Sequence, residues 1–204
     1  HVVAEKGLPR PFETSTAFYA LIEFENRSEQ DMDTAMELFE YCLEQGWISD
    51  GTISQSLSQA ESLWRLREDI SETIARFTPY KNDISVKVSR VPQFLADVDA
   101  LVSEAYPDFE IIWFGHIGDG NVHLNILKPD SLPREDFLSQ CSKVSEMVFA
   151  VVKNYEGSVS AEHGVGLLKK PFLGFARSDA EIAYMKAIKQ VFDPHNILNP
   201  GKLF

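Results

Sequence analysis

The sequence has few cysteines, no long apolar run and fewer basic than acidic residues. Its two cysteines, Cys42 and Cys141, cannot form a disulfide framework, and both stand in apolar helical contexts. We therefore expect two buried thiols in a reducing compartment. No stretch of 18 apolar residues occurs, so we expect no transmembrane segment. No secretory signal is visible, and because the chain begins at His1 rather than Met, we expect a processed chain or a fragment.

The charge balance limits the choice of partner. The 204 residues include 31 Asp and Glu but only 19 Lys and Arg, for a formal net charge of −12. This balance argues against nucleic acid or an anionic membrane surface as a partner. Residues 1–60 contain eleven of the acidic residues and only three basic ones. An anionic substrate is therefore compatible with the later part of the chain, provided that basic residues cluster there.

Hydrophobic periodicity predicts strands that alternate with helices. Ser58 and Glu61 have the spacing of a capping box, as do Ser178 and Glu181. We expect strands over 16–25 and 83–91, helices over 28–46, 58–77, 92–105, 133–155 and 178–192, a hairpin over 109–127, a short strand within 157–164 and an irregular tail. The hairpin makes part of the sheet antiparallel. The predicted fold class is α+β, with helices packed on one face of a mostly antiparallel sheet.

The stretch FGHIGDGNVHLNI, residues 114–126, predicts a hairpin that carries two histidines. Asp119-Gly120 is a strong signal for a type I′ turn, which needs positive φ at both central residues. With that turn, His116 lies directly opposite His123 on one face, with Cβ atoms roughly 4.5–5.5 Å apart. Two imidazoles placed in this way can bind one divalent ion.

Strand alternation places three polar residues of the second strand, Asn121, His123 and Asn125, on the face that carries His116. A polar row on a hairpin face is costly unless it lines a site or meets water. A solvated face with incidental histidines is the alternative, and the geometry alone leaves both open.

The stretch GSVSAEHGVG, residues 157–166, supplies a carboxylate. Two histidines with a carboxylate form an open divalent site that leaves coordination positions for water or substrate. Glu162 is the obvious third ligand. In a straight strand His163 points away from it, so both reach one site only if the chain bends, and Gly164 permits such a bend. An ordinary surface Glu-His pair remains the alternative.

Basic residues offer a place for a carboxylate. Arg67 and Ser71 are four positions apart on the predicted helix and so share a face, and Lys81 follows that helix. Arg would bind a carboxylate as a bidentate fork and Lys as a point charge. Each of them, taken alone, is more often a solvated surface residue.

Three motifs together, FGHIGDGNVHLNI, GSVSAEHGVG and DPHNILNPGKLF, resemble the C-terminal domain of FAD-linked oxidases of the vanillyl-alcohol oxidase superfamily. The chain is most similar to the D-2-hydroxy-acid dehydrogenase branch, and within it to the D-2-hydroxyglutarate dehydrogenases. The resemblance covers essentially the whole chain, residues 1–204. It implies a substrate- and metal-binding domain with a ferredoxin-like sheet. It also implies an FAD-binding domain N-terminal to this segment.

The resemblance further implies roles for individual residues. The residues that match the metal ligands, with zinc or a similar divalent ion expected, are His116, His123 and Glu162. His163 matches the catalytic base. The residues that match the groups holding the substrate carboxylates are Arg67, Ser71, Lys81 and Asn125. Asn121 and Asn199 match positions on the FAD side.

These roles imply oxidation of a D-2-hydroxy acid to a 2-oxo acid. The metal lowers the pKa of the substrate hydroxyl, His163 takes its proton, and hydride passes to FAD. The expected partners are the small-molecule substrate, the FAD-binding domain of the same polypeptide and an electron acceptor, with a homodimer left open. We expect the isolated chain to bind little FAD and to be inactive. The expected location is the cytoplasm in a bacterium and the mitochondrion in a eukaryote.

Three alternative functions stay open. D-lactate or glycolate oxidation belongs to the same family. A free-standing metal-dependent hydrolase could use the same two histidines and glutamate around an activated water. A non-catalytic carboxylate-binding module with a ferredoxin-like sheet would need no metal. Neither of the last two explains the terminal motif.

Overall fold

The computed structural model describes all 204 residues, which form two compact units, His1–Arg76 and Phe77–Phe204. Each unit is described by itself. None of the helices is both long and apolar enough to cross a membrane.

The first unit contains four helices: α1 (Val2–Lys6), α2 (Glu29–Glu44), α3 (Leu57–Glu68) and α4 (Ile70–Ala75). α2 confirms the helix predicted over 28–46, and Ser28 and Asp31 form a reciprocal capping box at its start. The strand predicted over 16–25 is wrong. That segment has no regular structure, and Phe18 and Ile22 are exposed. A β-branched and aromatic run becomes a strand only where a partner pairs with its backbone, and none does here.

The helix predicted over 58–77 is divided. α3 begins after Ser56, whose side chain accepts a hydrogen bond from Gln59 N, so the predicted cap by Ser58 is wrong. A one-residue interruption at Asp69 then separates α3 from α4. Arg67 and Ser71 therefore lie on consecutive short helices rather than on one continuous helix.

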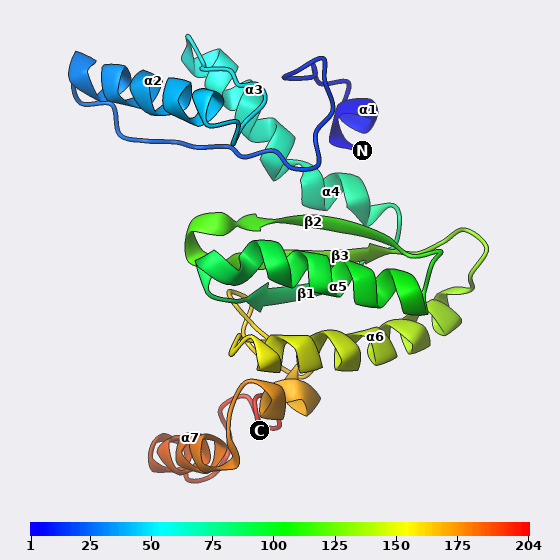
Figure 1. The fold of residues 1–204 in the computed structure, drawn as a ribbon. Coiled ribbons are helices and arrows are strands. Elements are labelled where there is room, and N and C mark those ends of the chain that lie inside the picture. The colour runs from blue at the N-terminus through cyan, green and yellow to red at the C-terminus, as the bar shows by residue number, and fades with distance from the viewer. The chain divides into compact units, whose positions relative to one another are not determined.

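The second unit is built on a three-stranded antiparallel sheet with the order β1-β3-β2. Its strands are β1 (Tyr80–Ser85), β2 (Glu110–His116) and β3 (Asn121–Leu127). α5 (Val91–Ala105) connects β1 to β2, and α6 (Arg134–Asn154) follows β3. Both helices cover the same face of the sheet (Figure 1). The predicted α+β class, with helices on one face of an antiparallel sheet, is confirmed.

The strand predicted within 157–164 is reduced to one antiparallel bridge, Ser85 to Ser158, on the free edge of β1. This bridge occupies the position of the fourth strand of a ferredoxin-like sheet. The strand predicted over 83–91 is shorter and earlier than expected, because residues 88–90 form a 3₁₀ turn, η1 (Val88–Arg90). The chain ends with η3 (Lys170–Phe175), α7 (Asp179–Phe192) and an irregular tail, as predicted for the last helix and the tail.

The core of this unit lies between the sheet and its two helices. Strand alternation points Ile84, Leu124 and Ile126 toward the helices, where Phe94 of α5 and Phe149 of α6 are also fully buried. Some polar contacts also cross this layer: Asn82 donates to Ser145, Ser145 donates to Tyr80, and Trp113 of β2 donates to Asp99 of α5. Because this face of the sheet packs against the helices, the alternate residues of the same strands, including Lys81, Asp83 and His123, lie on the other face.

The hairpin forms, but its register differs from the prediction. His116 pairs with Asn121, and His123 pairs with Phe114, so the direct His116–His123 pair is wrong. The connection is the 3₁₀ turn η2 (Ile117–Asp119) followed by Gly120, and Gly120 alone has positive φ. Glycine is required at position 120 for two reasons. Its φ is positive, and a Cβ there would lie 1.9 Å from the carbonyl oxygen of Val86. The two histidines still share a face, as diagonal neighbours.

The two thiols differ in exposure and should differ in reactivity. Cys141 is buried in α6, as predicted, whereas Cys42 on α2 is only half-buried. Burial raises the pKa of the Cys141 thiol to about 12, and the thiolate is the reactive form. Iodoacetamide should therefore label Cys42 in the native protein and Cys141 only after unfolding, as measured by peptide mass spectrometry. Native Cys42→Ser protein should stay unlabelled, and comparable native labelling of both cysteines would contradict this.

Candidate metal and substrate site

The face of the sheet opposite the helices carries the polar residues. β1 and β3 pair Lys81 with Asn125, Asp83 with His123 and Ser85 with Asn121, so these six side chains share that face. Asp83, Asn121, His123 and Asn125 are buried. Buried polar groups are costly unless they are bound, so this row has a structural or functional use.

A loop from the edge of the sheet covers part of this row. After the Ser85–Ser158 bridge, the chain passes Glu162 and His163 and turns at Gly164, whose φ is +74°. The backbone N–H groups of Ala161, Glu162 and His163 all point at the Asp83 carboxylate. The loop thus brings Glu162 and His163 to the polar face, with the chain bending at Gly164 as the sequence predicted.

The three residues predicted as metal ligands come together. His116, His123 and Glu162 each offer one ligand atom, and these atoms all lie within 4.8 Å of one another. His116 Nδ1 is 2.7 Å from Glu162 Oε1, and His123 Nε2 is 4.0 Å from Glu162 Oε2. The two imidazole rings are 5.8 Å apart and nearly perpendicular.

This arrangement fits a divalent ion. Zinc bonds to histidine nitrogen and carboxylate oxygen are about 2.0–2.2 Å long, so tetrahedral ligands lie roughly 3.4 Å apart. The distances from Glu162 to His116 Nδ1 and to His123 Nε2, 2.7 and 4.0 Å, lie on either side of that spacing. The side chains of His116 and Glu162 are 50% and 45% exposed, which leaves open coordination positions on the outer side. Two imidazoles and one carboxylate are a donor set suited to a catalytic rather than a closed structural site.

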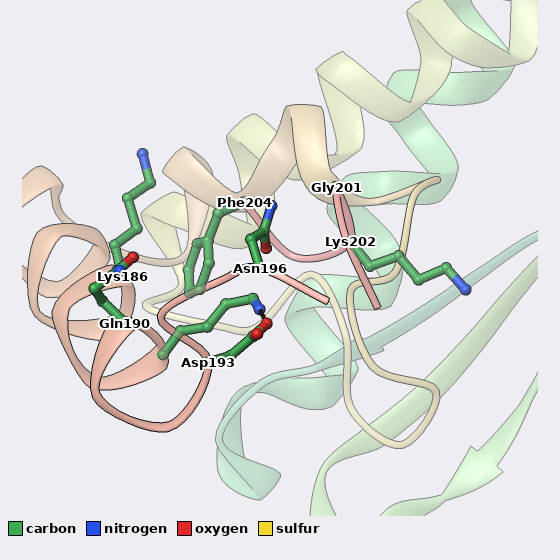
Figure 2. A pocket seen from close by; sticks show the side chains of 8 residues that line it. Lys186, Gln190, Asp193, Asn196, Gly201, Lys202 and Phe204 are labelled. Atoms are coloured by element: carbon green, nitrogen blue, oxygen red, sulfur yellow. Dashed lines mark hydrogen bonds and ion pairs between the residues drawn. The ribbon is translucent and has the colours of Figure 1, made fainter. Parts of the chain in front are cut away.

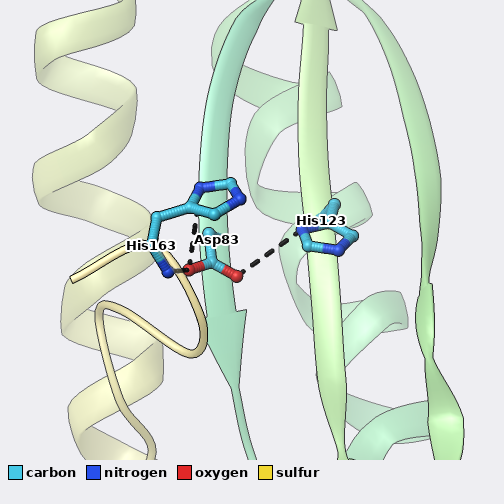
Figure 3. A group of neighbouring side chains, drawn as sticks. All are labelled: Asp83, His123 and His163. Carbon is cyan, nitrogen blue, oxygen red and sulfur yellow. Dashed lines mark hydrogen bonds and ion pairs between the residues drawn. The ribbon is translucent and has the colours of Figure 1, made fainter. Parts of the chain in front are cut away.

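A second group of potential ligands, Asp83, His123 and His163, shares His123 with the first (Figure 3). The two imidazoles flank the Asp83 carboxylate, and the rings of His123 and His163 are 5.8 Å apart and nearly parallel. Asp83 is only 2% exposed and already accepts three backbone hydrogen bonds. The group of His116, His123 and Glu162 is the more open of the two and is the better suited to hold an ion.

Asp83 was missed as a functional residue by the sequence reasoning. Burial opposes its ionisation, but the N–H groups of His163 and Glu162 and the charge of Lys169 outweigh burial, so the pKa of its carboxyl lies below its usual value. Lys169 Nζ is 3.5 Å from Asp83 Oδ2 and donates to Asp83 O and to Ser160 Oγ. The signal was present in the sequence as an acidic residue that alternates with Ser85 at the start of the strand predicted over 83–91.

The two asparagines of β3 remain only partly bonded. Asn125 Nδ2 donates to the carbonyls of Ile112 and His123, while its Oδ1 has no partner. Neither polar side-chain atom of Asn121 has a partner, although Asn121 is buried. Both side chains share the face of His123 and could bind a polar ligand there.

Of the other predicted residues, Lys81 shares the polar face of the sheet, whereas Arg67, Ser71 and Asn199 lie elsewhere in the chain. Arg67 and Ser71 belong to the first unit, on α3 and α4, whereas Lys81 lies on β1 in the second unit. Asn199 lies in the tail, with a positive φ of 47°. The tail is tied back by Leu203 N to Gly166 O and by Lys170 Nζ to Gly201 O.

A pocket of about 310 Å³ lies between α7 and this tail (Figure 2). Its lining includes Lys186, Asp193, Lys202 and Phe204. The Asp193 carboxylate accepts hydrogen bonds from Ile197 N and Leu198 N. None of the predicted metal-binding or catalytic residues lines this pocket.

Comparisons with known proteins identify the family of the chain. The family described as FAD linked oxidases, C-terminal domain, matches residues 1–203. The chain belongs to this family. FAD-linked oxidase C-terminal domains are parts of flavoproteins, so the match supports FAD as the cofactor of the protein that contains this chain. The family match says nothing about a metal, for which the observation is the group of His116, His123 and Glu162.

Curated relatives carry related names. A D-2-hydroxyglutarate dehydrogenase of Stutzerimonas stutzeri is 58% identical over 203 residues, which are 100% of this chain and 44% of the relative. One of Xanthomonas citri pv. viticola is 53% identical, over 100% of this chain and 43% of the relative. A mitochondrial protein of Schizosaccharomyces pombe, provisionally named a D-lactate dehydrogenase, is 38% identical over 96% of this chain and 38% of the relative. The chain thus spans less than half the length of these relatives.

Proposed function

We propose that this chain is the substrate- and metal-binding domain, residues 1–204, of an FAD-dependent dehydrogenase that oxidises D-2-hydroxyglutarate to the 2-oxo acid. The observation that carries the proposal is the approach of His116, His123 and Glu162 to within 4.8 Å, with the His163 imidazole beside His123. The names of the two most identical relatives given above support this substrate.

His116, His123 and Glu162 would hold the divalent ion, for which zinc suits the donor set. When bound, such an ion would supply a Lewis acid that favours loss of the substrate hydroxyl proton. Glu162 contributes the negative charge, and the two imidazoles contribute neutral nitrogen ligands. The exposed sides of His116 and Glu162 leave space for the substrate oxygens.

His163 would accept the hydroxyl proton. Its backbone N–H is held by Asp83 at 2.9 Å, while its imidazole is 59% exposed and faces the ring of His123. An imidazole beside the ligand group is well placed for proton transfer. FAD, held mainly by the N-terminal domain, supplies the acceptor for the Cα hydride. We propose Asn121 and Asn199 as contacts of this chain on the FAD side.

We propose Arg67 and Ser71 of the first unit, and Lys81 and Asn125 of the second, as contacts of the substrate carboxylates. The support is chemical, because a guanidinium and an ammonium suit a carboxylate, and it comes from the family resemblance.

Arg67→Ala tests the assigned substrate. Loss of a charge-assisted hydrogen bond, worth about 1.5–3 kcal/mol, should lower kcat/KM for D-2-hydroxyglutarate by about 10–150-fold, with little change for D-lactate, which lacks the distal carboxylate. The measurement is anaerobic flavin reduction in the full-length protein. Arg65→Ala is the matched control, because Arg65 lies on the same helix as Arg67 but pairs with Asp69. Equal losses on both substrates would contradict a distal-carboxylate role.

D-lactate oxidation is the second candidate, favoured by the name of the Schizosaccharomyces pombe relative. It would use the same metal ligands and base but would not need the distal carboxylate set. The Arg67→Ala comparison separates the two candidates.

The remaining partners are proposals of the same kind. The FAD-binding domain of the same polypeptide and an external electron acceptor complete the reaction, and a homodimer is compatible with it. Bacterial relatives and relatives named as mitochondrial both occur. We propose a cytoplasmic location if the source is bacterial and a mitochondrial one if it is eukaryotic.

A further inference from the structure

Asp83 belongs to neither the proposed ligand set nor the proton-transfer step, yet it faces His123 and binds the loop that carries Glu162 and His163. It lies on β1, is 2% exposed and directly faces His123 on β3. Its side chain also receives the loop that carries Glu162 and His163. A buried carboxylate in contact with three elements is costly unless each contact is used.

The two oxygens of this carboxylate have different partners. Oδ2 accepts hydrogen bonds from the backbone N–H groups of Ala161, Glu162 and His163 at 3.0, 2.8 and 2.9 Å. Oδ1 accepts no hydrogen bond but lies 3.5 Å from His123 Nδ1, just beyond good hydrogen-bond distance (Figure 3). One oxygen therefore holds the loop, and the other faces the histidine ring.

These contacts make Asp83 a poor metal ligand. Three backbone N–H groups donate to Oδ2, and the Lys169 ammonium lies 3.5 Å from it. These groups take up the acceptor capacity of Oδ2. Oδ1 faces the Nδ1 side of His123, whereas Glu162 faces Nε2. Asp83 and Glu162 thus approach opposite nitrogens of one imidazole.

The protonation pattern of His123 follows from this geometry. A neutral imidazole carries hydrogen on one nitrogen and a lone pair on the other. A carboxylate beside Nδ1 favours the tautomer with hydrogen on Nδ1, because it can only accept. The lone pair of Nε2 then points toward His116 and Glu162. Histidines that bind metals commonly have their second nitrogen held in this way.

We propose that Asp83 is the positioning residue of the site. Its Oδ2 builds the loop that presents Glu162 and His163, and its Oδ1 selects the His123 tautomer whose Nε2 can bind a metal. The inference rests on the metal site proposed above. It adds a residue that contacts neither substrate nor ion and acts through the groups that do.

Asp83→Asn separates the two roles. The three loop N–H groups require an acceptor, so the amide oxygen of Asn takes the place of Oδ2 and its NH₂ group faces His123. That NH₂ donates to Nδ1, which forces the hydrogen of His123 onto Nε2 and blocks the ligand lone pair. Asp83→Ala removes both roles. Asp99→Asn is the matched control, because Asp99 accepts from Trp113 Nε1 on the helical side of the sheet.

The test measures two properties of the full-length protein for each variant. Zn²⁺ affinity is measured by competition with a chromophoric chelator after metal removal, and backbone protection of residues 158–169 by hydrogen exchange and mass spectrometry. Asp83→Asn should weaken Zn²⁺ binding by about 10–100-fold while the loop stays protected. Asp83→Ala should weaken binding at least as much and speed loop exchange at least tenfold. Asp99→Asn should change neither property.

Each other outcome has a definite reading. Unchanged Zn²⁺ affinity in Asp83→Asn would overturn the tautomer role, and unchanged loop exchange in Asp83→Ala would overturn the loop role. An affinity loss that occurs only together with lost loop protection would reduce Asp83 to a purely structural residue. If the unsubstituted protein binds no Zn²⁺, the proposed metal site itself fails, and the tautomer role fails with it.

Discussion

His116→Ala is expected to remove the divalent ion from the protein and to lower turnover of D-2-hydroxyglutarate by on the order of 10³-fold. A Lewis acid at the reacting oxygen contributes several kcal/mol, and about 1.4 kcal/mol corresponds to each factor of ten. His116 is suited to this test because its side chain is half exposed at the end of β2, so its loss leaves the core intact. Metal content by mass spectrometry and flavin reduction rate are the two measurements.

His195→Ala is the matched control for the loss of one histidine. His195 lies in the exposed tail, outside both groups of potential ligands, so metal content and turnover should stay as in the unsubstituted protein. Chelation of the unsubstituted protein should lower its turnover to the His116→Ala rate. Added Zn²⁺ should then restore the turnover of the chelated unsubstituted protein but not that of His116→Ala. Full turnover by metal-free protein would rule out a catalytic ion.

His163→Asn should lower kcat by about 10²–10⁴-fold while leaving metal content unchanged. The substitution removes the proton acceptor but keeps the backbone N–H that binds Asp83. It also removes a ring that is largely exposed, so the fold should survive. The effect therefore falls on the chemical step rather than on the assembly of the site.

The check on His163 is the combination of kcat, KM and bound metal in one preparation. A fall in kcat with unchanged metal content identifies a proton-transfer role. Loss of the ion together with kcat would instead show that His163 supports the ligands. A variant with normal kcat would exclude His163 as the base, and another group would then have to take the hydroxyl proton.

The hairpin shows how far local reasoning reaches. Alternation along a strand depends only on backbone geometry, so the shared face of His116, His123 and Asn125 followed from the sequence. The register depended on the turn, and here the sequence misled. Asp119-Gly120 predicts a two-residue turn, but Val86 N donates to Gly120 O, and the longer 3₁₀ turn forms instead. A contact from another strand decided the pairing.

Helices were predictable where their own residues supply the start, stop and periodicity signals. The residues of α2, α5, α6 and α7 carry caps, a proline at the start or a clear apolar stripe, and all four helices form. The strand predicted over 16–25 failed because a strand needs a partner that lies elsewhere in the sequence. The break at Asp69 also lacked a local signal such as proline or glycine.

The sequence by itself determined the α+β class, the main helices and the residues able to bind a metal, because these follow from local periodicity and from side-chain chemistry. Only the tertiary structure decided that the carboxylate of Glu162 meets two imidazoles about forty positions earlier, and that Asp83 lies behind them. The physical reason is that hydrogen bonds from residues 161–163 to Asp83 join segments 78 to 80 positions apart. No local pattern records a contact of that range.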